Sequence, residues 1–224
     1  MIVAKRKPFE EILGLLAPYK KVLNVGCGTC VAVCLAGGER EVSILNAQLD
    51  MARRLEKNPL DLGEITLERQ CDREYLEALD SLVENYDAIL SMACGAGVQF
   101  VAERYPSIPV LPALDTTFIG VCQGMGWYEE RCRSCSVCVL GLTGGICPVT
   151  MCAKGLYNGP CGGSGRGICE VNPDQPCAWV LIYERLRAQN RLDLIQKVSP
   201  AREWQNQVPR TVIQPGYEKP EDAN

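Results

Sequence analysis

Residues 132–177 read CRSCSVCVLGLTGGICPVTMCAKGLYNGPCGGSGRGICEVNPDQPC and decide how the second half of the chain can fold. The segment holds eight cysteines within 46 residues, with glycine-rich turns between them. Hardly any stretch between the cysteines is long enough to pack an apolar core. We interpret the segment as a binding site for an inorganic cofactor held by cysteine sulfur.

The spacing of these cysteines favours 4Fe-4S clusters. Three cysteines are close together, and a later one is followed by proline, as in bacterial ferredoxins, where such a cysteine can serve a neighbouring cluster. Eight thiolates would fill two clusters. The candidate ligands are Cys132, Cys135, Cys138, Cys147, Cys152, Cys161, Cys169 and Cys177. The sequence does not decide whether Cys152 or Cys177 completes the group that begins at Cys132.

Structural zinc is the alternative for the same residues. Zinc takes four ligands in a tetrahedron and usually draws them from two separated Cys-x2-Cys pairs. A third cysteine three residues after such a pair suits a face of a four-iron cluster better than one small ion. Buried free thiols that act as small apolar residues would not explain so many cysteines beside so many glycines. Iron is therefore favoured, with zinc as the alternative at one or more sites.

Composition limits the class of protein. The chain has 224 residues, of which 47% are hydrophobic, and a net charge of -4. This length fits one full domain and a smaller one. Without a basic excess we expect no nucleic-acid partner. No apolar stretch is long enough to cross a membrane, and the start, MIVAKRKPFEEIL, carries charges where a signal peptide is apolar. We expect a cytoplasmic protein.

The counts of cysteine and histidine narrow the chemistry. Fourteen cysteines could form a secreted disulfide scaffold, but such scaffolds are usually short and enter the secretory route. In a reducing compartment they are typical metal ligands. There is no histidine, so the commonest general base is missing. We expect the chemistry to be carried by sulfur and predict no catalytic residue.

Residues 1–118 are predicted to form an α/β domain. Strands that alternate with helices indicate an open parallel sheet with helices on both faces. The predicted strands are 21–25, 41–46, 64–68, 88–92 and 108–113. The predicted helices are 8–17, one through Cys34, 47–57, one from Asp72 to Val83, and 98–105. Residues 115–130 are interpreted as a connecting segment.

Four further cysteines follow the predicted strands. Cys27 and Cys30 come after the first strand, Cys71 after the third and Cys94 after the fourth. The carboxyl ends of parallel strands lie along one edge of a sheet, where open sheets bind ligands. We therefore predict a third 4Fe-4S cluster at this edge. Cys34 could replace a ligand but is more simply a buried thiol, and Cys122 has no predicted role.

A dinucleotide site is the competing interpretation of the same edge. Gly26-x-Gly28 follows a strand and precedes a helix, as in a Rossmann fingerprint. That fingerprint would have glycine at Val31 and an acidic residue at Asn46, where the second strand is predicted to end. Two glycines of three, with no partner for a ribose, make the match weak. The glycines are better explained as space for a cluster beside backbone N-H groups.

Residues 119–198 are predicted to form a small cysteine-rich domain with little regular structure. A helix over 178–198 is expected to close it. Residues 199–224 are polar and contain four prolines. This tail is predicted to be a solvated end or an arm lying on a partner.

Five motifs together resemble a known family, the small cysteine-rich subunit that accompanies methylenetetrahydrofolate reductase in acetogenic and related anaerobic bacteria. This group is also called the methylenetetrahydrofolate reductase C-terminal-domain family. The resemblance extends over nearly the whole chain. The motifs are VGCGTC (25–30), ACGAGV (93–98), CVLGLTGGICP (138–148), NGPCGG (158–163) and CAW (177–179).

The resemblance implies a heteromer that acts in one-carbon metabolism, in the Wood-Ljungdahl pathway. The partner would be a flavin-containing catalytic subunit that reduces methylenetetrahydrofolate, and this chain would hold neither folate nor flavin. It would relay electrons from ferredoxin, a heterodisulfide-reductase-like module or an NADH-oxidising module to the flavin. The family is also described as zinc-binding, so the alternative is a zinc adaptor that docks the reductase to its donor. An independent enzyme with an open cluster position is a third interpretation.

Overall fold

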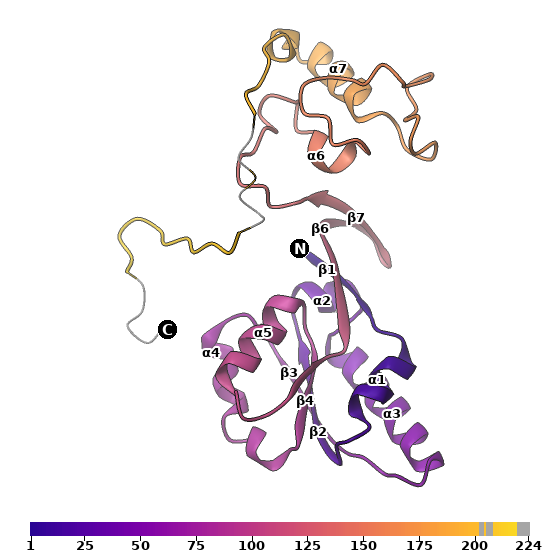
Figure 1. The fold of residues 1–224 in the computed structure, drawn as a ribbon, viewed down its shortest axis with the longest axis vertical. Coiled ribbons are helices and arrows are strands. Elements are labelled where there is room, and N and C mark those ends of the chain that lie inside the picture. Colours follow the sequence, from indigo (N-terminus) through magenta and orange to yellow (C-terminus); the bar gives the residue numbers. More distant parts are fainter. Residues whose placement is uncertain (202–203, 205–207, 219–224) are drawn as a thin grey trace. The chain divides into compact units, whose positions relative to one another are not determined.

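The computed structural model describes residues 1–201, 204 and 208–218. The chain divides into two compact units, Met1–Glu130 and Arg131–Asn224, and each is described by itself (Figure 1). In the described residues no helix has both the length and the apolar character that crossing a bilayer requires.

The first unit is built on a parallel sheet, as the alternation of strands and helices predicts. Its strand order is β3-β2-β4-β5. The registers are parallel throughout, with Val25 opposite Ile65 on one side and Ser91 on the other. The sheet has four strands and not five. Their bounds are β2 Lys21–Cys27, β3 Asp61–Leu67, β4 Ala88–Met92 and β5 Val110–Pro112.

The predicted strand at 41–46 is wrong, because these residues belong to a helix, α3 (Glu39–Leu55). The β-branched residues there indicate a strand, but the buried positions follow helical spacing. The buried residues of α3 are Val42, Leu45, Asn46, Leu49 and Arg53. At the start of α3 the Glu41 carboxylate accepts a hydrogen bond of 3.2 Å from the Gly38 backbone N-H, which satisfies a group that lacks an intrahelical partner.

The sheet has an apolar core on each face, because alternate residues of β2 and β4 point in opposite directions. One core contains Val22 and Leu90 and packs against α1 (Phe9–Leu16) and α3. The other contains Leu23 and Ile89 and packs against α5 (Gly95–Arg104). The helix predicted from Asp72 to Val83 is broken into short turns. These are α4 (Arg73–Leu76), η1 (Glu77–Leu79) and η2 (Val83–Asn85).

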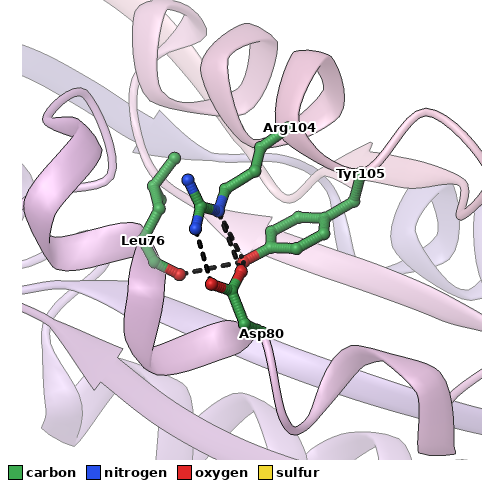
Figure 2. A network of polar contacts seen from close by, with 4 residues as sticks. All are labelled: Leu76, Asp80, Arg104 and Tyr105. Carbon is green, nitrogen blue, oxygen red and sulfur yellow. Dashed lines mark hydrogen bonds and ion pairs between the residues drawn. The ribbon is translucent and has the colours of Figure 1, made fainter.

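A polar cluster fastens α5 to the turn that follows η1 (Figure 2). Arg104 donates two hydrogen bonds to the Asp80 carboxylate, of 2.9 and 2.5 Å. The Tyr105 hydroxyl lies 2.6 Å from Asp80 Oδ1 and 2.9 Å from the Leu76 carbonyl oxygen. The ion pair holds the pKa of Asp80 at about 2, and burial beside this carboxylate raises the pKa of Tyr105 to about 12.

A second sheet corrects the interpretation of 115–130 as a connection. It has the order β1-β6-β7, with β1 (Ile2–Arg6) antiparallel to β6 (Leu114–Gly124), and β7 spans Trp127–Cys132. From the sequence alone, Gly120 suggests an interruption of regular structure. In the structure it lies within β6 and allows β6 and β7 to approach closely. A Cβ there would lie 2.3 Å from the Glu129 carbonyl oxygen. The five-residue strand β1 was not predicted.

The second unit has a small core around α7 (Ala178–Ala188), made by Ile146, Cys177, Trp179, Ile182 and Leu186. Besides α7 it contains α6 (Pro148–Met151) and η3 (Leu192–Ile195). The helix predicted over 178–198 therefore ends ten residues early. Asn190 has a φ of 54°, outside the helical region. Much of this unit consists of turns, as predicted for the cysteine-rich segment.

Candidate thiol sites

The fourteen cysteines are not paired in disulfide bonds. Twelve of them are the predicted ligands, which lie in two groups that belong to different units; Cys34 and Cys122 are in neither group. The first group lies at the carboxyl edge of the parallel sheet. The second lies in the turns around α6 and α7.

The edge of the sheet brings three predicted ligands near one another. Cys27 is buried at the end of β2, Cys71 is exposed in the turn after β3, and Cys94 is the half-buried N-cap of α5. Although the residue as a whole is exposed, partial burial of its thiol raises the pKa of Cys71, and the neighbouring Cys94 and Cys27 raise it further because nearby thiolates repel one another. Cys30, the first residue of α2 (Cys30–Val33), is half-buried.

Backbone hydrogen bonds fix the turn that carries Cys27. The Cys27 N-H donates to the Gly37 carbonyl at 2.8 Å, and the Gly28 N-H donates to the Leu67 carbonyl at 2.8 Å. The Cys27 sulfur lies 3.9 Å from the Glu68 carbonyl oxygen. Gly26 has a packing role, since a Cβ would lie 2.5 Å from the Thr66 hydroxyl oxygen. The glycine that suggests a dinucleotide site is thus explained by close contact between β2 and its surroundings.

Cys34 is buried, in agreement with its interpretation as a thiol facing inward. Its sulfur accepts a hydrogen bond of 3.5 Å from the Ala4 N-H and lies 3.6 Å from the Ala4 carbonyl oxygen. The thiol thereby satisfies backbone groups of β1. Burial raises its pKa. Cys122 is exposed on β6, with its sulfur 3.3 Å from the Gly124 carbonyl oxygen.

The second unit gathers four predicted ligands around one cavity of about 20 Å³. The residues that line the cavity are Cys152, Cys161, Cys169 and Cys177, together with Lys154, Ser164, Glu170, Ala178 and Trp179. Sequence reasoning left open whether Cys152 or Cys177 would join the Cys132 group. Both face the same cavity as Cys161 and Cys169.

Short elements position these thiols. Cys147 and Cys152 flank α6, and Pro148 between them occupies the first helical position, which suits a residue without an N-H. Cys177 is the N-cap of α7, and its own N-H donates to the Gly167 carbonyl at 2.7 Å. The Cys169 N-H donates to the Gln175 carbonyl at 3.0 Å. The chain between Gly165 and Pro176 forms two isolated antiparallel bridges that hold this loop.

An ion pair borders the same cavity. The Lys154 ammonium contacts the Glu170 carboxylate, and the Cys161 thiol donates to this carboxylate at 3.3 Å. The pair raises the pKa of Lys154 and lowers that of Glu170, with the Cys161 hydrogen bond as the second cause for Glu170. Sequence reasoning missed both residues, because one lysine and one glutamate have no spacing that marks them.

Two cysteine sulfurs accept backbone hydrogen bonds from the residue two positions later. The Ser134 N-H donates to Cys132 at 3.3 Å, and the Gly163 N-H donates to Cys161 at 3.4 Å. Ser134 and Ser136, which alternate with the closely spaced cysteines, have φ values of 47° and 70°. Non-glycine residues in this left-handed region are uncommon and gather at functional sites. Cys135 is half-buried, and Cys138 is exposed.

The donor set of both groups fits a thiophilic metal, because the candidate ligands are sulfur atoms. In the part of the chain that the structure describes, no three Cys, Asp or Glu side chains are arranged to hold one metal ion together. The residues therefore fit a thiophilic metal by the type of ligand they offer and, in the second unit, by the cavity that four of them share. Ligation would require the surrounding turns to rearrange.

One comparison with known proteins gives a match. Residues 111–205 match the model of a family described as methylene-tetrahydrofolate reductase C terminal. The match includes β6, β7 and the second group of thiols, and three of the five motifs noted in the sequence. Residues 1–110, with the thiols at the sheet edge, lie outside it. No curated protein and no solved structure matches the chain.

Proposed function

We propose that this chain is a metal-carrying, electron-transferring component of a methylenetetrahydrofolate reductase assembly. The observation that carries the proposal is the cavity lined by Cys152, Cys161, Cys169 and Cys177, within the segment that matches the reductase-related family. In the proposed complex the catalytic subunit holds flavin and folate, and this chain passes electrons to the flavin from a donor protein.

The chain's own residues would hold the metal and adjust its properties. In each group the ligands would be thiolates. The candidate ligands are Cys27, Cys30, Cys71 and Cys94 at the sheet edge, and the eight cysteines from Cys132 to Cys177. A bound 4Fe-4S cluster would supply one-electron redox chemistry, whose potential depends on hydrogen bonds to sulfur, burial and nearby charge. The N-H bonds to Cys132 and Cys161 and the Lys154–Glu170 pair are such influences.

The size of the cavity supports a second candidate function, the zinc adaptor. A space of about 20 Å³ is close to that of one or two waters. This volume is closer to the size of a single ion than to that of a four-iron cluster, although the described side chains would have to rearrange to bind either. A structural zinc ion held by four cysteines would stabilise this unit outright. In that case the chain would fasten the reductase to its donor and carry no electrons through this site.

Metal analysis of anaerobically purified protein separates the two functions. Electron transfer predicts a brown protein with acid-labile sulfide and about twelve irons per chain, from three clusters of four. Alanine at Cys71 or Cys94 should then remove roughly four irons. A colourless protein with zinc would leave only the adaptor. Unchanged iron in both alanine variants would exclude the cluster at the sheet edge.

Electron delivery is tested with the proposed partner. The flavin subunit alone should accept electrons from the physiological donor more slowly than the pair. Equal rates would contradict the relay, whatever metal is present.

A further inference from the structure

Gln70 lies fully buried in the turn after β3, one residue before Cys71. Its amide nitrogen donates to the Val25 carbonyl at 2.8 Å and to the Gly26 carbonyl at 3.0 Å. Its amide oxygen accepts a hydrogen bond of 2.6 Å from the Ser91 hydroxyl. One side chain therefore joins the ends of β2 and β4 to the turn that follows β3.

The three segments joined by Gln70 are those that carry the thiols at the sheet edge. Cys27 follows Gly26 directly, Cys71 follows Gln70, and Cys94 comes three residues after Ser91. Only a carboxamide of this length serves all three contacts. A carboxylate keeps the acceptor for Ser91 but loses both donors, and a shorter or apolar side chain leaves buried carbonyl groups without this partner.

The helix that begins after Cys94 is packed against the same side chain. A Cβ at Gly97, in the first turn of α5, would lie 3.0 Å from the Gln70 Cβ and 2.8 Å from the Ala93 Cβ. Glycine at this position lets α5 approach the Gln70 turn. The turn before Cys71 and the first turn of the helix after Cys94 are thus in close contact.

We infer that Gln70 is the positioning residue of the sheet-edge thiol site and holds together the three segments that carry Cys27, Cys71 and Cys94. This inference rests on the proposed function, in which that site binds metal. Gln70 itself would not be a ligand, because its amide group is engaged in these three hydrogen bonds. It acts by keeping the three turns in register, so that ligands from separate strands stay together.

Pulse labelling with N-ethylmaleimide tests the inference on the full chain as purified, with each cysteine quantified by peptide mass spectrometry. Buried Cys27 reports on the sheet edge, and buried Cys34, held by β1, reports on the integrity of the whole unit. The variants are Gln70→Ala, Gln70→Glu and Ser91→Ala. Gln48→Ala is the matched control, since Gln48 is an exposed glutamine that bonds Arg6.

Gln70→Ala and Gln70→Glu should raise the labelling rate of Cys27 relative to Cys34 by roughly ten-fold, the effect of about 1.4 kcal/mol of lost hydrogen bonding on a local opening. Ser91→Ala should give a smaller rise and Gln48→Ala none. If a Gln70 variant unfolds, Cys27 and Cys34 will react at equal rates. The labelling ratio in Ser91→Ala then decides whether the inference holds. An unchanged Cys27 to Cys34 ratio in the folded variants overturns the inference.

The metal content of the wild-type protein distinguishes this result from a failure of the proposed function. If Gln70→Ala loses the sheet-edge metal and retains the metal of the second unit, the result supports both the proposed function and the positioning role of Gln70. If the wild-type edge carries no metal, the proposed function fails there, but faster labelling of Cys27 still shows that Gln70 positions the thiols.

Discussion

Arg104 and Asp80 form a two-point ion pair that connects the last turn of α5 to the turn after η1 (Figure 2). Bidentate guanidinium-carboxylate pairs are more specific in geometry than single contacts. Because Tyr105 also donates to Asp80, the carboxylate is held in its ionised form. This cluster lies in the first unit and borders the core formed by Leu76, Leu79 and Tyr105.

The pKa of Asp80 predicts how the first unit responds to acid. Its folded value of about 2 is below the ordinary 3.8. The carboxylate therefore stabilises the folded state fully above pH about 4, and this contribution is lost as pH falls from 3.8 toward 2. Asp80→Asn should lower the melting temperature at pH 7 and have little effect at pH 2. Equal losses at both pH values would contradict the role of its charge.

The Tyr105 hydroxyl gives the opposite dependence. Because its pKa is raised to about 12 from 10, the neutral phenol stabilises the folded state at all pH values below 10, and that contribution is lost as pH rises toward 12. Tyr105→Phe should cost about 1 kcal/mol at pH 7, the typical value of one hydrogen bond. Chemical denaturation at pH 7 measures this loss. A variant as stable as wild type would show that the hydroxyl contributes nothing.

A buried amide pair between β2 and α3 should be sensitive to truncation. Asn24 is fully buried and donates to Asn46 at 2.8 Å, and Asn46 donates to Glu64 at 3.0 Å. Asn46→Ala leaves the Asn24 amide without this partner and should cost about 1–3 kcal/mol. Gln48→Ala, on the exposed face of the same helix, should lower the free energy of unfolding by less than about 0.5 kcal/mol. Urea denaturation of both variants compares them directly.

The charge pair beside the second thiol group should influence its redox properties. If iron binds there, Lys154→Gln removes a positive charge and leaves Glu170 beside the site, which makes addition of an electron harder. The midpoint potential should fall in this variant and rise in Glu170→Gln. A redox titration followed by electron paramagnetic resonance measures both. Shifts of the same sign in the two variants would rule out a charge effect.

The parallel sheet could be predicted from sequence because its strands are apolar and end in recognisable turns. Strand 88–92 and the helix after Pro8 lie where the patterns place them. The edge position of Cys27, Cys71 and Cys94 followed from topology alone. Residues 41–46 were wrongly predicted as a strand because β-branched side chains also occupy the inner face of a helix. Only the spacing of the buried residues over the full length of α3 shows that the segment is helical.

The remaining errors have a common cause in contacts between distant segments. The strand β6 contains Gly120, whose role depends on β7, and β1 is stabilised by pairing more than a hundred residues away. Gln70 could have been noticed as a polar residue beside a candidate ligand, but its burial and its three partners come from other strands. The shared cavity of the second unit likewise depends on turns, whose geometry cysteine spacing does not specify.

The motif NGPCGG (158–163) contains both a residue that bonds a distant backbone segment and a cysteine that lines the thiol cavity. Asn158 exchanges two hydrogen bonds with the backbone of Ser199, of 2.9 and 2.8 Å, and three residues later Cys161 reaches the thiol cavity. The turn that carries Cys161 is therefore tied by one amide side chain to Ser199, at the end of the segment that follows η3.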